Sequence, residues 1–135
     1  MLWSTEYETG HLRVDEQHKE LFNLVQQLLD GSLRGDDKDV ISHILVTLAG
    51  YTVTHFATEE ELMIRSEYPR LEEHQMQHDG FTDEVLRLVD LYKNGKITSV
   101  DDTIKGFIVE WLKDHIMGRD KEVAEHYKQW LESLE

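Results

Sequence analysis

The fold is decided by residues 44–63, which read ILVTLAGYTVTHFATEEELM. Apolar side chains recur there every three to four residues, as at Ile44 and Leu48, and this period is that of an amphipathic α-helix. The same stripe continues through His55 and Glu59 before it returns to apolar residues. These two are four residues apart and therefore project from one helical face. A core-facing stripe that carries an imidazole and a carboxylate predicts a polar site inside a helical core.

Three other segments show the helical period, and each of their apolar stripes also carries histidine. His74 and His78 are one turn apart, and two histidines at this spacing commonly bind a metal from one face of a helix. His18 lies on the core face of an earlier segment, and His115 continues the stripe of a later one. Helices are predicted from Asp15, as the N-cap, to about Gly31, from Asp36 or Asp37 to before Pro69, from Pro69 to Asn94, and from about Ser99 to Gly118.

Four amphipathic helices with short connections predict an all-α fold, an antiparallel up-down four-helix bundle. Residues 1–14 are expected to form an irregular N-terminal arm. Residues Lys121 to Leu134 are expected to form a short C-terminal helix that docks through Val123, Tyr127, Trp130 and Leu134. The 135 residues fit a single domain, 1–135.

Composition excludes several classes of function. With 28 acidic against 14 basic residues the net charge is -14, which repels nucleic acid and anionic membrane surfaces. There is no cysteine, so disulfides, zinc fingers and cysteine-ligated iron–sulfur clusters are excluded. No segment is expected to resemble a signal peptide or to approach the length of a membrane span, so a cytoplasmic location with no membrane partner is expected.

Asp120 is a further candidate ligand that a regular helix would misplace. It follows His115 by five residues, which is about 140° around an α-helix. A break or loosened turn near Gly118 could return it to the bundle axis. The same arithmetic points Glu60 and Glu61 away from the face of His55, and both are predicted to be solvated.

The candidate metal ligands are thus five imidazoles and two carboxylates: His18, His55, Glu59, His74, His78, His115 and Asp120. They are too many for one tetrahedral zinc, and calcium and magnesium prefer oxygen ligands. A mixed set inside a helical bundle favours a carboxylate-bridged pair of iron ions. The remaining histidines, His11, His43 and His126, are predicted to be surface or packing residues.

Four motifs in order make the sequence resemble the bacterial haemerythrins, a family of non-haem di-iron oxygen-binding proteins. They are Asp15-Glu16-Gln17-His18, His55-Phe56-Ala57-Thr58-Glu59-Glu60, His74-x3-His78 and Trp111-Leu112-x2-His115-Ile116-x3-Asp120. Each alone is weak, but four in one order are strong. The resemblance spans nearly the whole chain, including Trp3 and Gly10.

The resemblance implies two iron ions with unequal ligand sets. His74, His78 and His115 would hold one, His18 and His55 the other, and Glu59, Asp120 and an oxo or hydroxo group would bridge them. Dioxygen would bind reversibly at the open position of the second iron, where small anions such as azide could also bind. Storage, delivery and sensing all remain open, as does any protein partner.

A dry apolar wall should protect the bound oxygen from water. Leu112 lies one turn before His115 on the same face, so it is expected over the open position. Ile116, Phe56 and Trp111 are further wall candidates, with ordinary core packing as the alternative.

Two other functions are weighed against oxygen binding. A di-iron redox enzyme, acting on oxygen, peroxide or nitric oxide or as a ferroxidase, would typically use Glu-x-x-His pairs on two helices. Here that motif occurs once, at Glu8 and His11 in the expected arm, so a non-enzymatic protein is favoured. A metal-free interaction bundle would require all seven inward polar residues to be coincidental.

Overall fold

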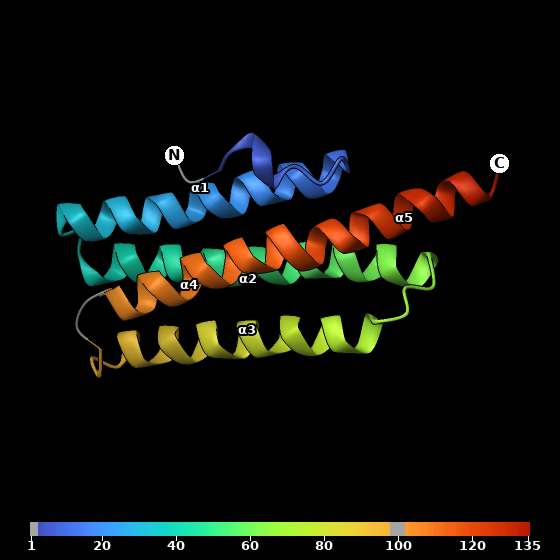
Figure 1. Cartoon of the computed structure of the whole chain (residues 1–135). Helices are drawn as coiled ribbons and strands as arrows, with labels where there is room; N and C mark the ends of the chain where they lie inside the picture. Colours follow the sequence, from blue (N-terminus) through green and yellow to red (C-terminus); the bar gives the residue numbers. More distant parts are fainter. Residues whose placement is uncertain (1–2, 98–101) are drawn as a thin grey trace.

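The computed structural model describes residues 3–97 and 102–135, and every regular element in these ranges is helical. The elements are a 3₁₀ helix η1 (Thr5–Tyr7), α1 (Leu12–Arg34), α2 (Lys38–Arg65), α3 (Leu71–Lys93), α4 (Asp102–Asp114), a π-helix η2 (His115–Asp120) and α5 (Lys121–Ser133). Consecutive long helices run in opposite directions (Figure 1). The predicted all-α, antiparallel four-helix bundle is confirmed.

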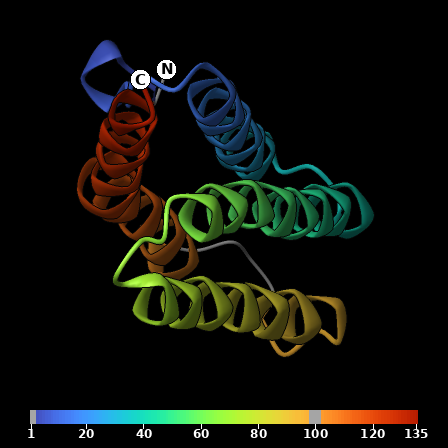
Figure 2. The same ribbon diagram turned by 90° about the vertical axis from the view of Figure 1, so that its right-hand side faces the viewer.

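The fourth column of the bundle is a rod made of three consecutive elements. The residues on either side of η2 keep helical backbone angles, so α4, η2 and α5 follow one another without a loop (Figure 1). Figure 2 shows this rod beside α1, α2 and α3. The C-terminal helix therefore extends the fourth helix instead of forming a separate tail. Val123 is buried as expected, but Leu134 is 64% exposed and does not dock.

The N-terminal end differs from the expectation at two points. First, α1 begins at Leu12, capped by His11, whose Nδ1 accepts a hydrogen bond from the Val14 N–H. The predicted cap, Asp15, lies inside the helix, and its carboxylate instead accepts from the N–H and O–H of Thr9 at 2.8 and 2.7 Å. Second, the arm is not wholly irregular, because η1 places the buried Tyr7 ring against Phe22.

The other helix ends follow local chemistry. Asp37 caps α2 by accepting from the Val40 N–H at 3.0 Å, which agrees with the predicted start near Asp36 or Asp37. Gly35 ends α1 in the left-handed conformation, with φ of 72°, which glycine adopts without steric strain. α3 begins at Leu71, two residues later than the expected start at Pro69. The expected start of the fourth helix, Ser99, lies outside the described residues.

The longest helix, α2, runs through the middle of the bundle and contacts α1, α3 and α5. Its 28 residues are long and apolar enough to cross a membrane, so the expectation that no segment approaches that length was wrong. Its apolar character has another explanation, since Leu45, Leu48 and Met63 lie in the core. The same helix also buries the ionisable side chains of His55 and Glu59.

Candidate metal centre

All seven predicted ligands are buried and converge in the middle of the bundle. They come from α1 (His18), α2 (His55, Glu59), α3 (His74, His78) and η2 (His115, Asp120). Their ligand atoms form two overlapping groups, and within each group all atoms lie within 4.8 Å of one another. Glu59 and Asp120 belong to both groups.

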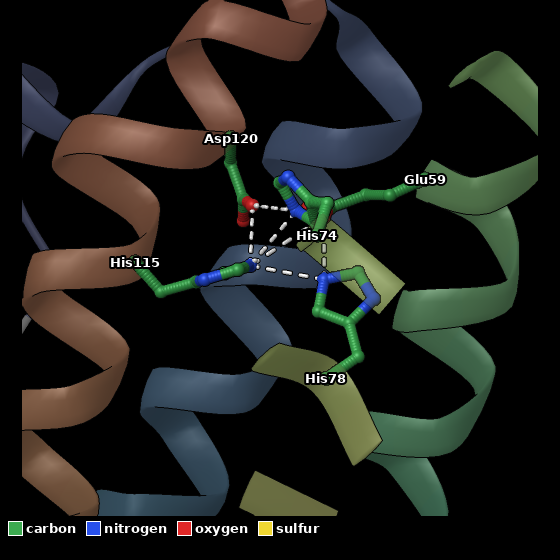
Figure 3. A group of neighbouring side chains, drawn as sticks. All are labelled: Glu59, His74, His78, His115 and Asp120. Carbon is green, nitrogen blue, oxygen red and sulfur yellow. Dashed lines mark hydrogen bonds and ion pairs between the residues drawn. The ribbon is translucent and has the colours of Figure 1, made fainter. Parts of the chain in front are cut away.

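One group contains three imidazoles, and Figure 3 shows how its members face one another. The His115 Nε2 lies 3.1 Å from the His74 Nε2 and 3.0 Å from the His78 Nε2. The Glu59 Oε2 is 3.3 Å from both the His74 and the His78 nitrogens. The Asp120 Oδ1 is 2.9 Å from the His115 Nε2. Five ligand atoms thus surround one point.

The second group contains two imidazoles and uses the other oxygen of each carboxylate. The His18 and His55 Nε2 atoms are 3.0 Å apart. The Asp120 Oδ2 lies 2.7 Å from the His18 Nε2, and the Glu59 Oε1 lies 2.7 Å from the His55 Nε2. Each carboxylate therefore presents one oxygen to the three-histidine group and one to the two-histidine group.

These contacts fit metal ions better than they fit hydrogen bonds. The Glu59 Oε1 and the Asp120 Oδ1 are buried beside imidazole nitrogens, yet neither has a partner in hydrogen-bond geometry among the described residues. Nitrogen ligands about 2.1 Å from a metal are about 3.0 Å apart when their bonds meet at 90°, and about 3.4 Å apart at the tetrahedral angle. The Nε2 separations of 3.0–3.1 Å match the 90° arrangement.

The electrostatics of the site also favour cations. Burial lowers the pKa of His55, but Glu59 and Asp120 outweigh it and raise that pKa to about 10. Burial likewise opposes the charged form of His115, whereas Asp120 and Glu59 raise its pKa to about 9. Burial would raise the pKa values of both carboxyl groups, but the surrounding imidazoles hold them well below their usual range. The two carboxylates therefore favour positive charge at the centre.

The π-helix explains how Asp120 reaches the site. In a π-helix the hydrogen bond runs to the fifth residue, so side chains five apart share a face. His115 and Asp120 are the first and last residues of η2 and both are buried. The predicted loosening of the helix is thus confirmed: the regular α-helix ends at Asp114, and the π-helix that follows contains Gly118. The helix is wider over these residues but remains continuous.

Aromatic rings cover the three-histidine group. Phe56 stacks on His78, with ring centroids 3.8 Å apart and planes within 5° of parallel. Trp111 stacks on His115 at 4.4 Å and 13°. The other two wall candidates, Leu112 and Ile116, are each 1% exposed.

Sequence reasoning missed three polar residues around the ligands. Glu60, predicted to be solvated, is partly buried, with its Oε2 3.6 Å from the His78 Nδ1. This contact directs the Glu60 carboxylate towards α3. Gln17 and Thr58 are buried and connected to His55. The available signals were the positions of Gln17 beside His18 and of Thr58 and Glu60 beside Glu59.

The three histidines outside the predicted set also lie outside both groups. His11 caps α1, and His43 is exposed on α2. His126 donates through its Nε2 to the Ser66 carbonyl at 2.9 Å.

Comparisons with known proteins agree with this geometry. The family model of the Hemerythrin HHE cation binding domain matches residues 9–127. A Bacteriohemerythrin of Clostridium acetobutylicum is 30% identical over 128 residues, covering 90% of this chain and 96% of that protein. A Bacteriohemerythrin of Methylococcus capsulatus is 31% identical, covering 90% of this chain and 92% of that protein. A crystal structure of wild-type hemerythrin has a TM-score of 0.86 at 29% identity, covering 94% of this chain and 97% of that one. The chain belongs to the haemerythrin family of HHE cation-binding domains.

Proposed function

We propose that this protein binds dioxygen reversibly at a carboxylate-bridged pair of iron ions, for oxygen storage, delivery or sensing. The observation that carries the proposal is the pair of buried ligand groups that share Glu59 and Asp120. Membership of the haemerythrin family, with relatives named Bacteriohemerythrin, supports the choice of iron and of oxygen.

The two groups would hold the two ions unequally. His74, His78 and His115 would hold one ion and His18 and His55 the other, with the two carboxylates bridging both together with an oxo or hydroxo group. Six-coordinate iron suits nitrogen contacts of 3.0–3.1 Å better than tetrahedral zinc does. The ion with fewer histidine ligands would be the one that accepts dioxygen. When bound, the iron pair would supply two electrons to dioxygen and recover them on its release.

The protein's own contribution is to keep water and protons away from the bound gas. Leu112 and Ile116 are almost fully buried, and Phe56 is 3% exposed. Water promotes irreversible oxidation, so an apolar surrounding favours reversible binding. A histidine-rich set with two carboxylates also differs from the carboxylate-rich shells of di-iron oxidases.

Replacing Leu112 with alanine should leave two irons bound and accelerate autoxidation. The change removes apolar volume that we propose covers the oxygen position and leaves every ligand in place, so water and azide should enter more readily. Decay of the oxygenated absorbance at matched iron content measures the effect.

Leu28→Ala is the matched control, because Leu28 is also fully buried but lies ten residues along α1 from His18, about 15 Å away. Both variants should lose roughly 2–5 kcal/mol of stability. Equal autoxidation rates in the two variants would show that Leu112 has no role beyond core packing.

The function itself is tested by metal and gas stoichiometry. Protein supplied with ferrous iron should hold two irons per chain and no haem, and should take up one dioxygen per iron pair. One iron per chain, or zinc retained at full occupancy, would contradict the proposal. Sustained oxygen consumption in the presence of a reductant would instead identify a redox enzyme.

A further inference from the structure

A series of buried hydrogen bonds connects α1 to the Nδ1 of His55, which is the ring nitrogen on the side away from the two-histidine group. The Gln17 Oε1 lies 2.8 Å from the His55 Nδ1, and the Gln17 Nε2 donates to the Thr58 Oγ1 at 3.0 Å. The Thr58 hydroxyl in turn donates to the Thr54 carbonyl at 3.3 Å. Gln17 is 8% exposed and Thr58 is 5% exposed, so little water competes for these bonds.

The direction of every bond in this series follows from its last member. A backbone carbonyl only accepts, so the Thr58 hydroxyl must donate to Thr54. The Thr58 oxygen is then free to accept from the Gln17 amide N–H, which orients the amide with its oxygen towards His55. That oxygen only accepts as well, so the His55 Nδ1 must carry a proton. Two ordinary side chains and one backbone carbonyl thereby fix the tautomer of the His55 imidazole.

This tautomer is the one that a metal requires. With the proton held on Nδ1, the lone pair of the His55 Nε2 points into the two-histidine group, 3.0 Å from the His18 Nε2. Hydrogen bonds to the distal nitrogen of a metal-ligating histidine fix the ring and raise its basicity. The buried Nδ1 atoms of His18 and His78, by contrast, have no hydrogen-bond partner among the described residues.

We propose that Gln17 and Thr58 are positioning residues that hold His55 for the metal of the two-histidine group and set the reduction potential of that metal. The role in metal binding rests on the proposed function. A neutral amide raises the basicity of His55 less than a carboxylate would. Compared with a carboxylate at the same position, the amide therefore leaves the reduction potential higher and favours the reduced, oxygen-binding form of the iron.

Gln17→Met keeps the volume of the side chain and removes the acceptor. It should weaken binding of one of the two ferrous ions about 10- to 100-fold, measured by competition with a chelator. It should also raise the reduction potential of the site, because His55 becomes less basic. Gln17→Glu should lower that potential, because a carboxylate accepts more strongly from Nδ1–H. Opposite shifts would not arise from a merely structural role.

Thr58→Val supplies a second test that leaves Gln17 in place. Its matched control is Thr52→Val, since Thr52 is also buried in α2 and its hydroxyl donates to the Ala49 carbonyl, with no link to His55. Thr58→Val should weaken iron binding in the direction of Gln17→Met, and Thr58→Ser, which keeps the hydroxyl, should restore it. Thr52→Val should hold both irons as the wild type does.

Two outcomes separate this inference from the function on which it rests. A wild-type chain that takes up no second metal contradicts both. A wild-type chain that holds two irons, with Gln17→Met equally tight and Thr58→Val indistinguishable from Thr52→Val, contradicts the positioning role alone. Potential shifts of the same sign in Gln17→Met and Gln17→Glu would also overturn it.

Discussion

Replacing His74 or His78 with alanine should reduce iron binding at the three-histidine group by at least about 100-fold, since even residues that only support a ligand contribute 10- to 100-fold. Each imidazole is almost fully buried and supplies one of the three nitrogens in that group. Alanine would leave the Glu59 and His115 atoms facing a gap, and the remaining ligands could not close it without moving a helix. Iron per chain after gel filtration, together with the loss of the oxygenated absorbance, measures the change.

His43→Ala is the control for these two variants. His43 is exposed on α2 and belongs to neither ligand group, so its loss should leave both irons bound. His126→Ala should also keep both irons, although it removes the 2.9 Å bond to Ser66. Iron losses of similar size in all four variants would show that the ligand assignment is wrong.

Deleting a single residue should be tolerated in η2 but should unfold the chain when the residue is in α3. Deleting Met117 shortens the π-helix by one residue, so that His115 and Asp120 become four apart and still share a face on a regular α-helix. The direction of α5 is then preserved, and Val123 stays in the core. We expect this variant to fold and to bind two irons. Its free energy of unfolding should fall by no more than about 1–3 kcal/mol.

Deleting Met76 is the matched change in a regular helix, because Met76 is also an exposed methionine. Here every later residue of α3 rotates by about 100°, which carries Phe81 and Val85 out of the core. We expect the lost hydrophobic burial to outweigh a typical free energy of unfolding, about 5–15 kcal/mol, so this variant should not fold. Circular dichroism and thermal unfolding compare the two. If both deletions unfold the chain, η2 is not a one-residue insertion in an otherwise α-helical rod.

The bundle and the positions of its candidate ligands could be predicted because both depend on one local period. Apolar residues three and four apart identify a buried helical face, and a histidine on that face must point inwards whatever the neighbouring helix is. His18, His55, Glu59, His74, His78 and His115 all follow this rule, and the structure brings them together. Asp120 does not follow it, and the geometric conflict itself indicated a loosened helix.

Features that depend on a second helix could not be predicted in the same way. The side chain of Gln17 lies about 100° from that of His18 on α1, and nothing in that helix shows that His55 of α2 faces it. The contact of Glu60 with His78 likewise depends on how α2 packs against α3. The cap of α1 was misplaced because Asp15 is a good capping residue by type, whereas the Thr9 side chain and backbone hold its carboxylate.

The central claim is tested most directly by one optical cycle. The protein is loaded with ferrous iron without air, exposed to oxygen, and then returned to an oxygen-free atmosphere while its absorbance is recorded. An absorbance band should appear on oxygenation, disappear when the gas is removed, and return on the next exposure with two irons still bound per chain. A band that never forms, or one that persists after the oxygen is removed because the irons have been permanently oxidised, would contradict reversible oxygen binding.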